Sequence, residues 1–87
     1  MPNAIQIDIY SRPDCHLCDE AKAVIERVQQ RCPFALRIIN INIDEDPALV
    51  TAYGTEIPVI FINGNKAFKY YVDEAELEKK VRRLWKT

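Results

Sequence analysis

The hydrophobic period of the chain changes abruptly near Pro13. Residues 4–10 alternate apolar and polar side chains and place isoleucines on one side, which is typical of a strand with one less buried face. After a break at residues 11–14, apolar residues recur at spacings of three and four. This predicts a helix over residues 15–30 with Asp14 as its N-cap. A strand followed directly by a helix favours a strand–helix–strand unit, in which the two strands are parallel and the crossover is right-handed.

Local signals predict the next elements. Cys32-Pro33 ends the helix, because proline disfavours helical geometry in the residue before it. Residues 35–42 are rich in isoleucine and form a second strand. Asp46-Pro47 is typical of a helix start, and this short helix runs to about Tyr53 and stops at Gly54.

The last third of the chain predicts a hairpin and a closing helix. Residues 59–62 are an apolar strand, and Asn63-Gly64 is a strong hairpin signal, so residues 66–71 return antiparallel. Asp73-x-x-Glu76 is a capping box that begins the last helix. Its apolar face consists of Ala75, Leu77, Val81 and Leu84. The order β-α-β-α-β-β-α predicts an α/β fold, with a four-stranded mixed sheet flanked by helices in a single domain over residues 1–87.

Charge and hydropathy exclude several classes of function. The chain has 12 basic and 13 acidic residues, a formal net charge of −1 and no run of five like charges, which argues against nucleic-acid binding. The apolar run at residues 59–62 is far shorter than the roughly twenty residues of a membrane helix. The first residues lack the features of a secretory signal. We therefore expect a cytoplasmic monomer that binds neither nucleic acid nor membranes.

Two of the three cysteines, Cys15 and Cys18, form a Cys-x-x-Cys pair at the predicted helix start. An odd number of cysteines without a signal peptide argues against a disulfide-stapled secreted scaffold. Residues three apart on a helix are neighbours, and unpaired N–H groups and the helix dipole stabilise a thiolate at this end. We expect Cys15 to attack a substrate disulfide and Cys18 to resolve the mixed disulfide.

Other roles for the sulfur atoms are weaker alternatives. A structural zinc site needs four ligands, and beyond the pair only Cys32 and His16 remain, so we expect no metal site. Cys32 is either a half-buried residue at a helix end or a regulatory, glutathionylated thiol. His16 either favours the thiolate when it is protonated or is a solvent-exposed spacer.

Five further residues are candidates for the same site. Arg12 offers its charge to the thiolate or to an incoming carboxylate, or lies in solvent. Pro58 stands at a strand entrance. There it forms either a cis bond with Ile57, which presents the backbone to a bound peptide or thiol, or an ordinary trans bond. Tyr70 and Tyr71 close the fourth strand, where one packs on the core and the other lines the site.

With these residues in place, the sequence resembles the glutaredoxins, members of the thioredoxin fold. The similar stretches are residues 10–18 (Tyr-Ser-Arg-Pro-Asp-Cys-His-Leu-Cys) and Ile57-Pro58-Val59. A small glutaredoxin-like family is a closer match. It shares Cys-His-Leu-Cys-Asp-Glu-Ala at residues 15–21, Asn-Ile-Asp-Glu-Asp-Pro at residues 42–47, and Tyr53-Gly54.

By position, the resemblance implies a role for each matched residue. Cys15 matches the nucleophile and Cys18 the resolving thiol of a thiol-disulfide oxidoreductase. Pro58 matches the cis-proline that faces them, and Ile57 matches the residue whose backbone pairs with the substrate. Arg12 stands where glutaredoxins commonly place a lysine that assists the thiolate and glutathione binding. The implied activity is electron transport to disulfides in cell redox homeostasis, with a redox-active disulfide centre.

The sequence also departs from the family pattern. Glutaredoxins usually carry Gly-Gly and then an acidic residue where glutathione docks, whereas this chain has Tyr70-Tyr71 followed by Asp73 as the candidate acidic anchor. The expected substrate is a disulfide-containing protein or a glutathione mixed disulfide. A thiol reductant, either glutathione or one of the thioredoxin-reductase type, would supply electrons, and no bound cofactor is expected. The alternative is a non-catalytic binding or redox-sensing module of the same fold.

Overall fold

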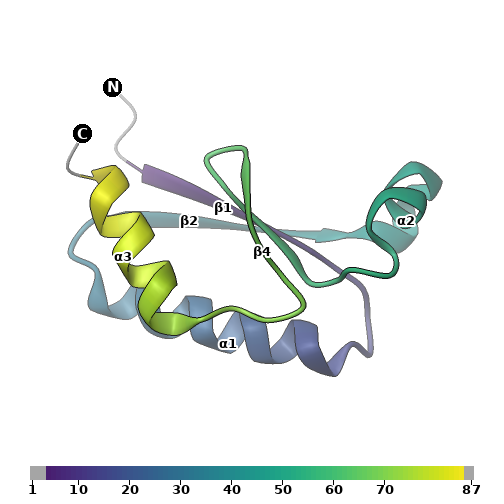
Figure 1. Cartoon of the computed structure of the whole chain (residues 1–87), viewed down its shortest axis with the longest axis horizontal. Coiled ribbons are helices and arrows are strands. Elements are labelled where there is room, and N and C mark those ends of the chain that lie inside the picture. Colours follow the sequence, from purple (N-terminus) through teal and green to yellow (C-terminus); the bar gives the residue numbers. More distant parts are fainter. Residues whose placement is uncertain (1–3, 86–87) are drawn as a thin grey trace.

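Four strands form one mixed sheet in the order β2-β1-β3-β4 (Figure 1). The strands are β1 (Ala4–Ser11), β2 (Ala35–Asn42), β3 (Val59–Ile62) and β4 (Asn65–Lys69). β1 pairs with β2 in parallel and with β3 in antiparallel orientation, and β3 continues into β4 through a hairpin. The computed structural model describes residues 4–85 and confirms the predicted α/β fold with a mixed sheet.

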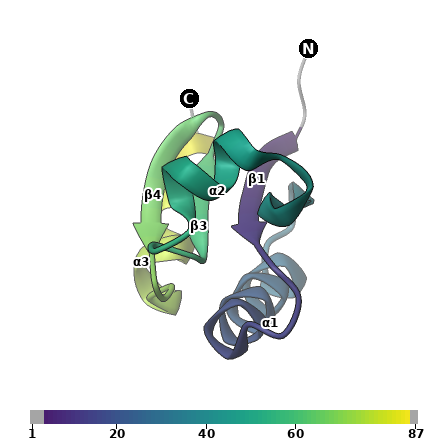
Figure 2. The same ribbon diagram turned by 90° about the vertical axis from the view of Figure 1, so that its right-hand side faces the viewer.

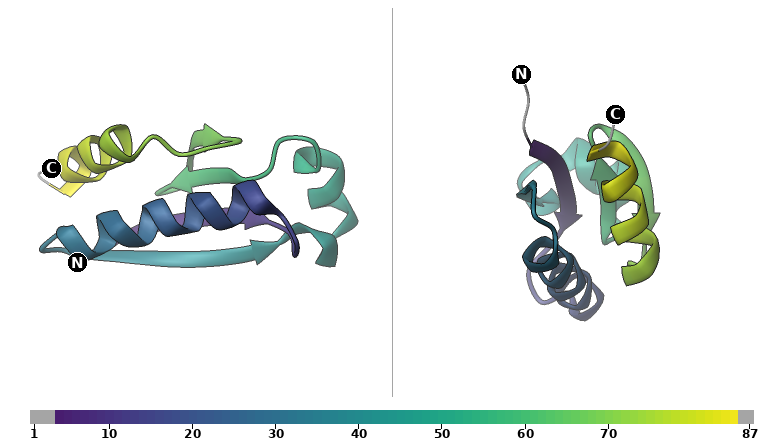
Figure 3. Two further views of the ribbon diagram at one scale, coloured as in Figure 1. Left: turned by 90° about the horizontal axis from the view of Figure 1, so that it is seen from below. Right: turned by 90° about the vertical axis from the view of Figure 1, so that its left-hand side faces the viewer.

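The helices lie on the sheet in two places. α1 (His16–Arg31) and α3 (Glu74–Trp85) cover the same face, as the end-on view shows (Figure 2). Seen from below, α1 runs along the length of the sheet and α3 lies beside it (Figure 3). A short 3-10 turn, η1 (Ile43–Glu45), and α2 (Pro47–Tyr53) lie at the end of β2, at the right of Figure 1.

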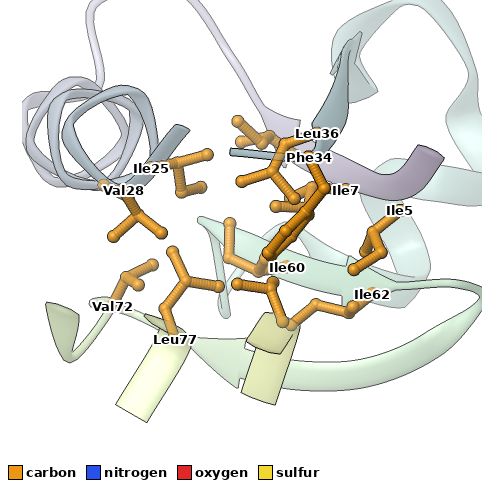
Figure 4. Close-up of a cluster of buried hydrophobic side chains, with 13 residues drawn as sticks. Ile5, Ile7, Ile25, Val28, Phe34, Leu36, Ile60, Ile62, Val72 and Leu77 are labelled. Atoms are coloured by element: carbon orange, nitrogen blue, oxygen red, sulfur yellow. The ribbon is translucent and has the colours of Figure 1, made fainter. Parts of the chain in front are cut away.

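The core lies between the sheet and the two long helices (Figure 4). In β1, Ile5, Ile7 and Ile9 are buried, which confirms the predicted alternation. Side chains of α1 and α3 meet them, and the largest fully buried ones are Ile25, Val28, Leu77 and Val81. Each such side chain stabilises the fold by about 1.5–3 kcal/mol. The other two residues of the predicted α3 face, Ala75 and Leu84, are exposed.

α2 contacts the opposite face of the sheet through aromatic rings. The ring of Tyr53 lies 4.9 Å from that of Tyr10 in β1 and 6.1 Å from that of Phe61 in β3, measured between centroids. The rings of Tyr10 and Phe61 lie 5.3 Å apart in an edge-on arrangement, which aromatic pairs favour. Burial raises the pKa of the Tyr10 hydroxyl, and the charge of Asp8 adds to this effect.

Ion pairs join α1 to α3 on the surface. Glu74 pairs with Arg27 at 3.0 Å and with Arg31 at 2.7 Å, and Glu78 pairs with Arg31 at 2.7 Å and Arg82 at 2.9 Å. Hydrogen bonds from Arg31 are the main reason why the pKa values of both glutamates lie below the usual range. Exposed pairs are individually weak, but a shared network fixes how the two helices lie against each other.

The predicted N-cap of α1 was wrong. The cap is Cys15, whose Sγ accepts a hydrogen bond from the backbone N–H of Cys18 at 3.1 Å. Cys15 has the extended backbone that a cap requires, with φ −104° and ψ 107°. Asp14 has a φ of 60°, so it makes the turn between β1 and α1 and is not the cap.

The predicted end of β4 was also wrong, because the strand stops at Lys69. Tyr70 has a φ of 72°, which breaks the extended conformation, and the N–H of Tyr71 bonds the carbonyl of Lys69 in a tight turn. The tyrosines are therefore not alternating strand residues. Both are exposed, Tyr70 by 44% and Tyr71 by 69%. The expectation that one of them packs on the core was therefore wrong.

Other predicted boundaries are confirmed. Asn63 and Gly64 both have positive φ, at 49° and 84°, as a type I′ hairpin turn requires. Asp46 caps α2 by accepting a hydrogen bond from the N–H of Ala48 at 2.9 Å. Asp73 caps α3 by accepting one from the N–H of Glu76 at 3.0 Å. Both caps supply an acceptor for N–H groups that lack partners within the helix.

Candidate active site

A disulfide joins Cys15 and Cys18 at the point where β1 leads into α1, with their Cα atoms 5.2 Å apart. Cys18 is fully buried, whereas Cys15 is half-exposed. Cys15 stands at the helix N-terminus, where the dipole and unpaired N–H groups favour a negatively charged sulfur. The two cysteines are therefore unequal, since Cys15 is partly exposed and Cys18 is shielded from solvent.

Pro58 lies at the same end of the sheet as the disulfide. Tyr10 pairs with Val59 in the antiparallel register, so the last residues of β1 lie beside the first residues of β3. The Ile57-Pro58 peptide bond is cis, as the resemblance implied. The ring of Pro58 is fully buried, so the cis bond belongs to the packed part of the molecule.

Glu56 ties the segment before Pro58 to β4. Its carboxylate pairs with Lys66 at 3.1 Å and with Lys69 at 3.9 Å. The hydrogen bond and charge of Lys66, together with the charge of Lys69, lower the pKa of Glu56. Sequence reasoning missed this residue, and the available signal was a carboxylate beside Ile57-Pro58 together with two lysines in β4, the second strand of the hairpin. The pairing itself depends on the β3–β4 register.

Arg12 directly follows β1, and its side chain pairs with a carboxylate of η1. Its Nη2 and Nε both donate to Oδ1 of Asp44, at 2.9 and 3.1 Å. The side chain of Arg12 is about one-third exposed, at 33%. It also borders a surface pocket of about 230 Å³ that includes Ser11 and Asn42. Its action on a thiolate or on an incoming carboxylate stays a prediction.

His16 and Leu17, between the two cysteines, both face solvent. The Nε2 of His16 lies 2.8 Å from a carboxylate oxygen of Glu20, one turn along α1, and its side chain is 85% exposed. Its nearest charged partner is therefore Glu20, and its effect on the thiolate stays a prediction. Leu17 is 45% exposed and presents an apolar side chain directly beside the disulfide.

Tyr70, Tyr71 and Asp73 follow β4 at the Pro58 end of the sheet. Lys69 Nζ lies 5.4 Å from the centroid of the Tyr70 ring, within the range of a cation–π contact. Asp73 uses one carboxylate oxygen as the α3 cap. The substrate-binding roles of these residues stay predictions.

Cys32 is separate from this site. It is the C-cap of α1, where its N–H bonds the carbonyl of Val28 at 3.1 Å, and it carries a free thiol. The helix of 16 residues between it and the disulfide spans about 24 Å. Burial raises the pKa of the Cys32 thiol, the opposite of what a nucleophile requires. Its regulatory role stays a prediction.

Residues 4–85 contain no group of three or more His, Cys, Asp or Glu side chains arranged to hold a metal ion. None of the helices described combines the length and the apolar character needed to cross a bilayer.

The mixed sheet, its helices and the cysteine pair at the start of α1 define a thioredoxin-fold protein with a site of the thiol-oxidoreductase type. The chain belongs to the family of the glutaredoxin-like domain (DUF836), whose model matches residues 6–82.

Individual proteins support this assignment. A thioredoxin of Methanocaldococcus jannaschii is 35% identical over 65 residues, covering 74% of this chain and 76% of that protein. A glutaredoxin-like protein of Dictyostelium discoideum is 30% identical over 78 residues, covering 85% of this chain and 72% of that protein. The X-ray structure of a structural genomics target from X. campestris superposes with a TM-score of 0.71. It is 27% identical, and the match covers 88% of this chain and 96% of that one.

Proposed function

We propose that the chain is a thiol-disulfide oxidoreductase whose Cys15–Cys18 pair cycles between dithiol and disulfide. The observation that carries this proposal is the unequal burial of the two residues of a closed disulfide: Cys15 is partly exposed at the start of α1, and Cys18 is fully buried. A purely structural disulfide gains nothing from one exposed sulfur at a helix N-terminus. A redox pair needs one sulfur for the substrate and a second that is protected from it.

The reaction proceeds in two exchanges. The Cys15 thiolate attacks one sulfur of the substrate disulfide, forms a mixed disulfide and displaces the other substrate sulfur as a thiolate, which takes up a proton. Cys18 then loses its proton and attacks Cys15 Sγ. This closes the Cys15–Cys18 disulfide and releases the second substrate thiol. Two electrons and two protons pass to the substrate, and an external thiol such as glutathione returns them.

The surroundings of the pair support this sequence of steps. Cys15 Sγ already accepts the N–H of Cys18, a bond that also stabilises a thiolate at the same atom. Ile57 and Pro58 lie directly before β3, the strand next to β1, and the backbone of Ile57 would pair with an extended substrate. The exposed side chains of Leu17 and Tyr70 favour a polypeptide that carries apolar residues near its disulfide.

The test is intact-mass spectrometry of the protein equilibrated in a series of glutathione redox buffers. We expect loss of two hydrogen atoms at one defined midpoint. Cys18→Ser should abolish this transition, and the matched control Cys32→Ser should retain it. If the pair stays reduced and unreactive across the series, the oxidoreductase proposal fails and a binding module of the same fold replaces it.

The same experiment addresses the electron donor. In Cys18→Ser, the mixed disulfide formed at Cys15 has no resolving thiol and accumulates. A glutathione adduct on Cys15 would support glutathione as a direct partner despite Tyr70-Tyr71. Reduction of the wild-type protein only by a thioredoxin-reductase-type system would point to a protein donor.

A further inference from the structure

A pocket of about 240 Å³ lies between the β3–β4 hairpin and the last turns of α3. It is lined by Ile62, Asn65, Lys66, Ala67, Lys80, Arg83 and Leu84. The hairpin stands near the centre of Figure 1 and the last turns of α3 at its left, whereas α1 begins at the right. β3 runs from the Pro58 end of the sheet to this pocket, so the pocket is separate from the disulfide.

The lining is apolar at its base. Ile62 is 4% exposed and belongs to the hydrophobic core, and Ala67 packs against that core. Leu84 adds a third apolar side chain from α3. A ligand with an apolar body would therefore cover hydrocarbon surface when it enters.

Apart from Asn65, the remaining lining residues are the cations Lys66, Lys80 and Arg83. Lys80 and Arg83 are three residues apart on α3 and so lie on neighbouring positions of one helix face. Among residues 4–85, no carboxylate pairs with either of them, and none of the lining residues is acidic. Lys66 is the exception, because it pairs with Glu56 at 3.1 Å.

The acidic residues of α3 are engaged elsewhere. Glu74 and Glu78 pair with arginines, and Glu76 lies 3.5 Å from Lys79. The charges of Lys80 and Arg83 are therefore available to an external anion. They form a local positive site on a chain whose formal net charge is −1.

We propose that this pocket binds a small organic carboxylate, with its apolar body over Ile62 and Ala67 and its charge between Lys80 and Arg83. The volume equals that of about eight water molecules at roughly 30 Å³ each. It lies below the roughly 300–1,000 Å³ of pockets for drug-sized ligands, so a single ring or short alkyl chain fits better than a nucleotide.

Phenylacetate is the probe, and its uncharged analogue phenylacetamide is the control for charge. Each is titrated into the full chain while amide chemical shifts are followed by NMR. We expect saturable shifts with phenylacetate at the amides of Ala67 and Leu84, and weaker binding of phenylacetamide. Added salt should weaken phenylacetate binding and leave phenylacetamide unaffected, a comparison that requires no variant.

Variants then test the two cations. Lys80→Gln and Arg83→Gln should each weaken phenylacetate binding by about twofold to fivefold, as expected for loss of one partly exposed charge pair. Arg37→Gln removes the same charge from β2, outside the pocket, and should leave the affinity unchanged. Equal affinities for the two probes, equal losses in all three variants, or no saturable shift at the pocket would each overturn the proposal. In those cases, the only role of Lys80 and Arg83 is to stabilise α3 through the negative, C-terminal end of its dipole.

Discussion

The backbone N–H of Tyr70 donates a hydrogen bond to the carbonyl oxygen of Pro58, with the two atoms 2.9 Å apart. This bond joins the residue that follows β4 to the cis-proline at the same end of the sheet as the cysteine pair. Tyr70 makes this bond with a backbone φ of 72°, a conformation that is common for glycine and uncommon for tyrosine. The fold therefore keeps a bulky aromatic residue at a position where glycine would be less strained.

Replacing Tyr70 with glycine should make the protein more stable. The left-handed conformation costs a side-chain-bearing residue about 1–2 kcal/mol. The greater entropy of glycine in the unfolded chain offsets about 0.5–1 kcal/mol of this gain. We expect Tyr70→Gly to raise the free energy of unfolding by about 0.5–1 kcal/mol, measured by urea denaturation. Tyr70→Ala keeps the Cβ atom and should show no such gain. A loss of stability in the glycine variant would show that the tyrosine ring contributes more than its backbone costs.

The three thiols of the reduced protein should differ in reactivity. Cys15 is half-exposed at a helix N-terminus, Cys18 is fully buried, and burial raises the pKa of Cys32. We expect iodoacetamide at pH 7 to modify Cys15 first, as peptide mapping by mass spectrometry would show. Because a raised pKa keeps a thiol protonated, the rate at Cys32 should be low at pH 7 and should still be rising above the ordinary thiol pKa of about 8.5. Faster labelling of Cys32 at neutral pH would contradict this order.

Asp73 should contribute to stability as a helix cap. Its carboxylate accepts the N–H of Glu76, so Asp73→Ala leaves that donor of α3 without its partner. We expect a loss of about 1 kcal/mol in the free energy of unfolding. Asp73→Ser retains an acceptor and should recover most of the loss. If glutathione adduct formation on Cys15 falls equally in both variants, Asp73 also acts as an anionic anchor.

The pairing of Glu78 should make stability depend on pH in a defined direction. Hydrogen bonds from Arg31 and Arg82 hold its pKa below the usual range in the folded protein. A lowered folded pKa contributes stability that is present above the unfolded value of about 4.3 and is lost as the pH falls through the folded pKa. The stability difference between wild type and Glu78→Gln should therefore be largest above about pH 5 and shrink below it.

The control for this measurement is Glu26→Gln. Among the described residues, no ion pair involves Glu26, which lies on the surface of α1. Its substitution should leave the pH profile of unfolding unchanged. Parallel profiles for Glu78→Gln and wild type would show that the network between α1 and α3 contributes nothing measurable.

Local signals in the sequence predicted most of the fold. The bounds of β2, the Asp46-Pro47 helix start and the Asn63-Gly64 turn each depend on a few adjacent residues, and all three are confirmed. The cysteine pair and the cis bond before Pro58 could also be predicted, the second only through the resemblance to glutaredoxins.

What the sequence could not predict depends on residues far apart in the chain. Arg31 and Glu78 are 47 positions apart and meet only because α1 and α3 share a face. Glu56 and Lys66 meet only because the β3–β4 hairpin brings β4 back beside the segment before β3. The mistaken N-cap has a different origin, because both Asp14 and Cys15 carry a side chain that accepts a hydrogen bond. Only the backbone angles decide between them.

The central place of β1 has a consequence for how the molecule opens. β1 is bonded to β2 along its whole length and to β3 on its other side, whereas β2 and β4 each have one free edge. Fluctuations that expose amides begin where pairing is one-sided, so hydrogen exchange should be fastest in the edge strands and slowest in β1. The cysteine pair follows this most protected strand directly. We therefore expect its geometry to survive partial openings of the edges, so that the proposed thiol exchange would not require every strand to stay paired.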